Sequence, residues 1–304
     1  MKLSAVIVSR NDNYGGNLIE RSSYCFNSMI NTFDEVFYID WNSETHSLLY
    51  DVKENIEFKG NFHHIVIEPK IARILTNYDS QAQKCCEVLG RNIGLRRSTG
   101  DWLVSTNIDI IAPRREDLEN TIKSLDENTF YTVSRRDAEL PVIQKFNSDN
   151  NFLEYKNWRE VREYLISNSE ERHYEEKTTE GDDYSLVNCC GDFQLANKKI
   201  WHDLRGMEED LIYALYADTN VQKKSVMHGY KLKAIYNPAF FHINHGKGGG
   251  GFLTGVNRKA NDMYRAIINQ NKTQNKETWG FGDIEIEQEI LDRKSTRLNS
   301  SHRT

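Results

Sequence analysis

The sequence predicts an α/β fold in which a parallel sheet carries crossover helices. The first observation behind this prediction is that short apolar runs alternate with helix-like segments through the first third of the chain. The second is that several of these runs stop in a cluster of polar residues. The third is size, because 304 residues with 38% hydrophobic and 28% charged side chains suffice for one large α/β domain or two small ones.

The elements of the first half follow in order along the chain. Apolar runs of strand length lie at 5–8, 36–39, 62–67 and 102–106. Helical patterns lie between them, at 18–32 and 82–97. Polar residues follow three of the runs, at 9–12, 40–43 and 107–109. Ligands of parallel sheets collect beyond the carboxyl ends of the strands, so we expect a binding site at this edge.

The second half is less regular and more polar. A helix is expected near 158–166 and a strand at 239–241. Four consecutive glycines follow Lys247 and predict a hinge or lid, because such a run forms neither a stable helix nor a stable strand. The polar tail 291–304 has no apolar periodicity, and we expect it to be disordered and non-native.

Composition excludes several classes of protein. A net charge of −6 argues against a nucleic-acid binder held mainly by phosphate contacts. No apolar run approaches the ~20 residues of a membrane helix, and the apolar start is too short for a secretory signal. The five cysteines lack metal-type C-x-x-C spacing, which predicts reduced core thiols in a cytoplasmic protein.

The end of the strand at 102–106 holds an unusual pair of side chains. Asn107 and Asp109 lie two residues apart on one face, between two apolar runs. An amide and a carboxylate placed in this way either make local turn hydrogen bonds or hold a ligand such as a cation.

Four segments carry a resemblance to a known family. They read, in chain order, CCEVLGRNIGLRRSTGDWLVSTNIDII, CCGDFQLANKKIWHDLRGM, ADTNVQKKSVMHGYKLKAIYNP and FFHINHGKGGGG. These segments resemble the family-2-like glycosyltransferases of the GT-A fold. The resemblance spans about residues 3 to 290. The resemblance implies a single GT-A domain at 1–290. A Rossmann-like donor-binding half at 1–112 would join a mixed-sheet acceptor half at 113–290, with a lid near 246–259.

The resemblance also implies a function and a donor site. The chain would move a sugar from a nucleotide-diphosphate donor, UDP-linked, to a hydroxyl of a glycan or glycoconjugate. Asp109 would hold Mn²⁺ or Mg²⁺, because such hard ions want carboxylate oxygen, and His242 or His245 would add a contact. Asn107 stands where the family usually has Asp, so it would contact ribose or a metal-bound water. The donor would contact Ser9, Arg10, Asp12, Asp40, Arg91, Asn92 and Asn107.

In the acceptor half, Asp218 matches the position of the family's catalytic base, which removes the proton of the attacking hydroxyl in an inverting transfer. Ala217 replaces the family's neighbouring Glu. Asp192 and Trp279 would contact sugars. Lys247, Arg258 and Lys259 would close over the diphosphate. We interpret 208–210, Glu-Glu-Asp, as a charged helix start.

Simpler interpretations stay open for each of these residues. Strand-end carboxylates are often turn residues, Arg91 could lie on an exposed helix face, and Trp279 could be a packing residue. Because of Asn107 and Ala217, the rival function is a catalytically inactive nucleotide-sugar or glycan-binding protein. A nucleotidyltransferase ranks last, because the segment SRNDNYGGN lacks a dense, basic, glycine-rich phosphate loop.

Overall fold

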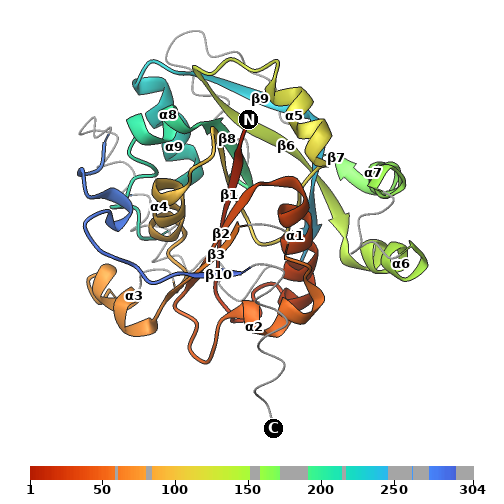
Figure 1. Ribbon diagram of the computed structural model, residues 1–304, viewed down its shortest axis with the longest axis horizontal. Coiled ribbons are helices and arrows are strands. Elements are labelled where there is room, and N and C mark those ends of the chain that lie inside the picture. Colours follow the sequence, from red (N-terminus) through yellow and green to blue (C-terminus); the bar gives the residue numbers. More distant parts are fainter. Residues whose placement is uncertain are drawn as a thin grey trace.

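The computed structural model describes residues 1–58, 61–79, 84–150, 158–171, 191–213, 217–245, 262 and 274–291. Its centre is one mixed sheet, in which ten strands of the described chain take the order β10-β3-β2-β1-β4-β8-β6-β9-β5, with β7 beside β6. The helices cover both faces of this sheet (Figure 1).

The N-terminal half, up to Thr106, is a run of parallel strands joined by helices. Its strands are β1 (Leu3–Ser9), β2 (Glu35–Trp41), β3 (Asn61–Ile67) and β4 (Trp102–Thr106). Its helices are α1 (Leu18–Thr32), α2 (Leu48–Val52), α3 (Pro69–Leu75) and α4 (Glu87–Arg97), with a 3₁₀ turn, η1 (Lys53–Asn55). All the neighbouring pairs among β1 to β4 are parallel, which confirms the Rossmann-like half.

Alternation along β1 divides the core into two layers. Ala5 and Ile7 pack with the cluster that includes Cys25 of α1, whereas Val6 and Val8 pack with the cluster that includes Ile93 of α4. Helices α1 and α4 accordingly cover opposite faces of the sheet (Figure 1).

Two glycines let α4 approach the sheet closely. A Cβ added at Gly90 would lie 2.7 Å from Val8 Cγ1, and one added at Gly94 would lie 2.5 Å from Val6 Cγ1. Both contacts are shorter than atoms tolerate, so these two positions of the helix face accept only glycine without a shift of the neighbouring valine.

The C-terminal half has a mixed strand arrangement, as expected. Its strands are β5 (Ile110–Ile111), β6 (Thr129–Glu139), β7 (Ser169–Glu171), β8 (Phe193–Asn197) and β9 (Lys231–Asn244). Its helices are α5 (Arg115–Ile122), α6 (Leu140–Asn150), α7 (Trp158–Ser167), α8 (Lys198–Asp203) and α9 (Ala217–Met227). Strand β8 runs antiparallel to both β4 and β6, whereas β6 and β9 are parallel.

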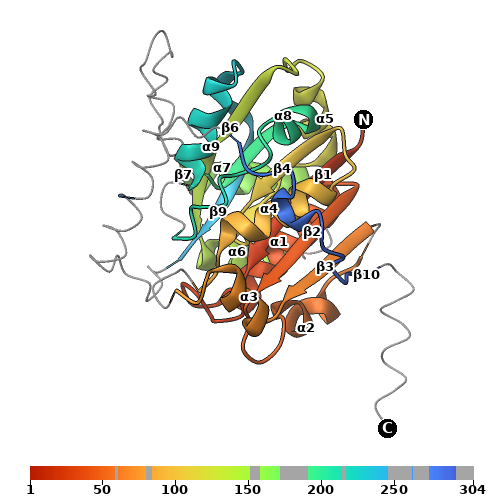
Figure 2. The ribbon, with the colours of Figure 1, turned by 90° about the vertical axis from the view of Figure 1, so that its left-hand side faces the viewer.

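The C-terminal described segment returns to the N-terminal half. It contains the 3₁₀ turn η4 (Trp279–Phe281) and β10 (Glu289–Leu291), which pairs antiparallel with β3 at the sheet edge (Figure 2). Strand β10 therefore includes Leu291, the first residue of the predicted tail. No helix in the part of the chain that the structure describes combines the length and apolar character needed to cross a bilayer.

Three local predictions need correction. Helix α4 begins at Glu87 rather than at 82, and the strand at 239–241 is the end portion of the longer β9. Residues 208–210 do not start a helix, because the segment from Met207 to Tyr213 forms bends and turns. The lid at 246–259 with Lys247, Arg258 and Lys259, the pair Cys189 and Cys190, and the tail from 292 lie outside the described residues.

Candidate active site

A buried carboxylate, Asp109, lies at the carboxyl edge of the sheet in the turn between β4 and β5. Its Oδ2 atom lies 3.1 Å from Nη1 of Arg21, 3.0 Å from Nε2 of His245 and 3.8 Å from Nε2 of His242. Burial raises the pKa of Asp109, but the hydrogen bond from His245 and the charges of the two histidines and Arg21 outweigh it. The net effect is a pKa below the usual value.

The possible metal-ligand atoms around Asp109 fit a divalent ion. One ligand atom from each of Asp109, His242 and His245 can be chosen so that all three lie within 4.8 Å of one another. The other carboxylate oxygen, Oδ1 of Asp109, is buried and has no hydrogen-bond partner in the part of the chain that the structure describes. A carboxylate with two imidazoles suits Mn²⁺ better than Mg²⁺, which prefers oxygen ligands and water.

Strand pairing brings the two histidines to Asp109. His242 of β9 is the register partner of Ile110 in β5, and the N–H of Ile243 donates to the Asp109 carbonyl at 2.9 Å. His245 follows the end of β9. The sequence left open which histidine lies at Asp109, and the structure places both there.

Arg21 is a site residue that the sequence analysis missed. It lies in α1, where its fully buried side chain donates from Nε to the Gly16 carbonyl at 3.0 Å and contacts the Tyr14 carbonyl. A signal for it exists, since Leu18 and Cys25 flank it at helical spacing, so a guanidinium stands within the apolar stripe. A buried charge of this kind needs a partner, and Asp109 provides it.

The loop before α1 fits closely against His245. Asn13, Gly15, Gly16 and Asn17 all have positive φ. A Cβ added at Gly15 would lie 2.3 Å from Nδ1 of His245. Glycine at this position therefore lets the loop and the imidazole lie against each other.

A row of charged and polar side chains runs from His242 across the sheet. Nδ1 of His242 lies 3.0 Å from Oδ1 of Asp137, which lies 2.9 Å from Nε of Arg135. Arg135 also pairs with Oδ2 of Asp192, whose Oδ1 accepts a hydrogen bond from Asn107 Nδ2 at 2.6 Å. Arg135 and Asp137 belong to β6, which the sequence analysis did not predict.

Arg91 and Asn107 form the other end of this row. Arg91 is 5% exposed, which rules out the exposed helix face considered for it. It donates to Ser105 Oγ at 2.8 Å and to Glu87 Oε2 at 2.8 Å, and it contacts Oδ1 of Asn107. The Asn107 amide is thus oriented by Arg91 on one side and by Asp192 on the other.

The ends of β1 and β2 form a second polar group. Ser9 Oγ lies 2.9 Å from the Tyr38 hydroxyl, which donates to Asp40 Oδ2 at 3.1 Å. The N–H of Leu48 also donates to this oxygen at 3.1 Å. Asp40 is fully buried, and its other oxygen has no hydrogen-bond partner among the described residues.

The neighbouring loop carries Arg10 and Asp12. Arg10 is 6% exposed and donates to Glu44 Oε1 at 2.8 Å. Asp12 is more open, and its Oδ1 accepts the N–H of Tyr14 at 3.1 Å. Four of the predicted donor-contact residues, Ser9, Arg10, Asp12 and Asp40, therefore lie at the ends of β1 and β2, where Asp40 is buried and Asp12 is more exposed.

Asp218 lies against the turn that carries Asp192. In the first turn of α9, its two carboxylate oxygens accept the N–H groups of Gly191 at 3.1 Å and Thr219 at 2.8 Å. Burial is the main cause that raises the pKa of Asp218, and the charge of Asp192 adds to it. A raised pKa makes this carboxylate a stronger base.

Asn92 and Trp279 lie apart from this group, between α4 and η4. The Asn92 amide makes 2.8 Å hydrogen bonds to both the carbonyl and the N–H of Met207. Trp279 is 4% exposed and packs against the Arg96 guanidinium and the His202 ring. In this structure both side chains hold the 206–209 segment and η4 in place.

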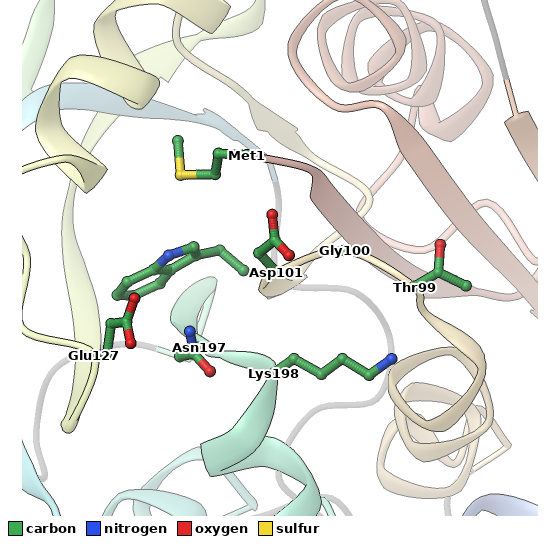
Figure 3. Close-up of a pocket in the computed structure, with 8 residues that line it drawn as sticks. Met1, Thr99, Gly100, Asp101, Glu127, Asn197 and Lys198 are labelled. Carbon is green, nitrogen blue, oxygen red and sulfur yellow. The ribbon is translucent and has the colours of Figure 1, made fainter.

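Two cavities lie at opposite edges of the sheet. One of about 430 Å³ is bordered by Gly15, Arg21 and His245, beside the candidate metal centre. The other, about 540 Å³, lies at the amino ends of β1 and β4, where Met1 and Asp101 border it together with Lys198 (Figure 3). Parallel sheets bind ligands at the carboxyl edge, so the first cavity has the position expected of a functional site.

The fold is similar to that of solved glycosyltransferases. The mannosyltransferase PcManGT from Pyrobaculum calidifontis, in complex with GDP-Man and Mn²⁺, has a TM-score of 0.50 at 14% identity, over 92% of this chain and 67% of that chain. This likeness confirms the expected GT-A fold. No protein-family model and no curated protein sequence matches the chain.

Two structures of S. aureus TarS are weaker matches. Their TM-scores are 0.47 and 0.46, at 11% and 14% identity. They cover 88% and 80% of this chain, which spans only 40% and 60% of the TarS chains.

Proposed function

We propose that this chain is a metal-dependent glycosyltransferase, which moves a sugar from a nucleotide-diphosphate donor to a hydroxyl of a glycan or related acceptor. The observation that carries the proposal is the cluster of Asp109, His242 and His245 at the carboxyl edge of the sheet. PcManGT, which has a similar fold, was solved in complex with GDP-Man and Mn²⁺, and this supports a nucleotide-sugar donor for the chain.

The metal centre is assigned to the diphosphate of the donor. Asp109, His242 and His245 would hold the ion. Oδ1 of Asp109, which has no hydrogen-bond partner among the described residues, is available as a ligand atom. When bound, a divalent ion neutralises negative charge that develops on a diphosphate leaving group. The Arg21 guanidinium adds a fixed positive charge beside it.

The nucleoside is assigned to the ends of β1 and β2. The unpartnered Oδ1 of Asp40 and the more open Asp12 can accept hydrogen bonds from ribose hydroxyls or from the imide N–H of a base. Asp40 is fully buried, so a donor group that reaches it would satisfy an oxygen that otherwise costs stability. We propose a UDP-linked donor, with a GDP-linked donor as the alternative.

The base is assigned to Asp218. Its carboxylate would accept the proton of the acceptor hydroxyl while that oxygen attacks the anomeric carbon, which inverts the configuration at that carbon. The neighbouring Asp192 is bonded to Asn107 and Arg135, so it can hold a sugar hydroxyl in a fixed direction. Its charge also favours proton uptake by Asp218.

Thermal melting with nucleotides tests the donor and metal together. A ligand that binds only the folded chain raises its melting temperature. A free ligand concentration of ten times the Kd adds about 1.4 kcal/mol to the free energy of unfolding, which raises the melting temperature by roughly 3 °C. We expect UDP to raise it more with Mn²⁺ than with EDTA, and more than with Mg²⁺. GDP and ADP, measured under the same conditions, are the comparison nucleotides for UDP. Equal shifts with Mn²⁺ and with EDTA would remove the metal from the proposal.

An inactive binding protein is the second candidate. Asn107 and Ala217, which stand where the family has acids, favour it. The two functions separate by donor consumption, measured as nucleotide release from a panel of UDP- and GDP-sugars with Mn²⁺. A chain that binds a nucleotide sugar tightly but releases no nucleotide, with or without acceptor glycans, would support the binding protein.

A further inference from the structure

Strands β6 and β9 pair with an irregularity that sets which side chains meet. Val133 pairs with Ile235, but Arg135 already pairs with Phe240. One residue of β6 therefore lies opposite four residues of β9, and the register moves by three. An odd shift exchanges the two faces of a strand, so this irregularity decides which side chains of β9 face the site.

The shifted register places Asp137 directly beside His242. Oδ1 of Asp137 lies 3.0 Å from Nδ1 of His242, while the opposite nitrogen, Nε2, lies 3.8 Å from Oδ2 of Asp109. An imidazole that donates its Nδ1–H to a carboxylate keeps a lone pair on Nε2 for a metal. His242 is 7% exposed, so few other groups compete for its ring nitrogens.

Arg135 contacts the same oxygen of Asp137 as His242 does. Its guanidinium lies 2.9 Å from Asp137 Oδ1 through Nε and pairs with Asp192 through Nη1. The side chains of Arg135, Asp137 and Asp192 are 11%, 18% and 11% exposed, so the row is largely screened from water. A charged pair in such a setting has a defined geometry and cannot rotate freely.

We propose that Asp137 is a positioning residue for the metal centre: it fixes the ring of His242 with Nε2 toward the ion, and Arg135 fixes Asp137. This inference rests on the proposed function, because it assumes that His242 is a metal ligand. In this assignment Asp137 acts on the ion through His242 and is not itself a ligand. Outer carboxylates of this kind typically change metal affinity by about 10- to 100-fold.

Mn²⁺ affinity of the full chain, measured without donor by the electron paramagnetic resonance signal of free Mn²⁺, tests the proposal. Asp137→Ala is expected to weaken Mn²⁺ by about 10- to 100-fold. Asp137→Asn keeps an oxygen that accepts the Nδ1–H of His242, so its affinity should lie between those of the wild type and of the Ala variant. Far-ultraviolet circular dichroism verifies that each variant is folded.

A carboxylate on the other neighbour of β6 provides the control. Glu171 of β7 is the register partner of Arg136, and its Oε2 lies 3.1 Å from Nη1 of that residue. Glu171 does not border the cavity beside the candidate metal centre, so the Mn²⁺ affinity of Glu171→Ala should stay within about twofold of the wild type. An equal loss in Glu171→Ala and Asp137→Ala would overturn the proposal.

Two further outcomes separate this inference from the proposed function. A wild type that binds Mn²⁺ while Asp137→Ala binds it equally well would overturn the positioning role and leave the metal centre intact. A wild type that binds no Mn²⁺, alone or with UDP, would overturn the metal centre and this inference with it.

Discussion

Two carboxylates buried at opposite ends of the same sheet have different surroundings. Glu35 begins β2 at the amino edge and is 3% exposed, and Asp109 follows β4 at the carboxyl edge and is 4% exposed. Glu35 accepts hydrogen bonds from Ser4 Oγ at 2.6 Å and from Thr99 N and Oγ1 at 2.8 and 3.0 Å. Both of its oxygens accept hydrogen bonds, and Lys2 Nζ and His63 Nε2 also lie 3.5 and 3.6 Å from its Oε1.

Asp109 also has positively charged or chargeable neighbours from distant parts of the chain, but they meet at a single oxygen. Arg21 comes from α1, and His242 and His245 come from β9 and its end. All three contact one oxygen, and the other oxygen has no hydrogen-bond partner among the described residues. Burial of a carboxylate therefore does not mark a site by itself. What distinguishes Asp109 is that this oxygen lies beside two imidazoles that could hold a metal ion with it.

The largest expected effect is that of Asp109→Asn. The amide cannot replace the charged ligand, so Mn²⁺ binding should be lost and sugar transfer should fall by about 100-fold or more. The buried Arg21 also loses its carboxylate, which destabilises the fold by up to about 3 to 5 kcal/mol. Metal titration and nucleotide release, measured well below the melting temperature, check both effects. Unchanged Mn²⁺ affinity would place the metal elsewhere.

Asp218 sharpens the comparison, because it resembles Glu35 in its hydrogen bonds but lies near Asp192. Asp218→Asn keeps the size of the side chain but cannot accept a proton. We expect donor affinity to stay the same and transfer to slow by ~10²-fold or more, the scale for a general base. Transfer at the wild-type rate would make Asp218 a structural carboxylate like Glu35, and the base would be sought at Asp192.

The smallest expected effect on function is that of Glu35→Gln, which should change only stability. Its loss of charged hydrogen bonds costs about 1 to 3 kcal/mol at neutral pH, with Mn²⁺ affinity unchanged. Urea denaturation of the wild type and the variant measures this difference, and metal titration provides the control. A loss of Mn²⁺ affinity in Glu35→Gln would contradict the division between the two ends of the sheet.

The pH dependence of this difference has a definite sign. Burial raises the pKa of Glu35, but hydrogen bonds from Ser4 and Thr99 and the charge of Lys2 hold it below the ordinary value of 4.5. The ionised form is therefore favoured by folding, and its contribution is present above pH ~4.5 and lost as the pH falls through the folded pKa. The difference between wild type and Glu35→Gln should accordingly shrink in acid.

Local patterns alone determined the strands of the N-terminal half of this protein. Alternation of apolar runs predicted β1 to β4 in parallel order, and polar residues at strand ends predicted Asp40 and Asp109 at one edge. These signals are local, because a strand's burial and its ending depend on a few consecutive residues. The sequence also indicated His242 and His245 together, since they lie beside each other at the end of one strand.

Only the tertiary structure decided which other side chains contact those residues. Arg21 lies within an apolar helix stripe, and Asp137 meets His242 only because β9 has three more residues than β6 across their irregular pairing. The sequence analysis predicts Asn92 as a donor contact and Trp279 as a sugar contact. In the structure both side chains pack where α4 meets η4. Register, helix rotation and strand order are set by contacts between residues far apart in sequence. A local pattern can therefore predict which residues end a strand, but not which side chains meet there.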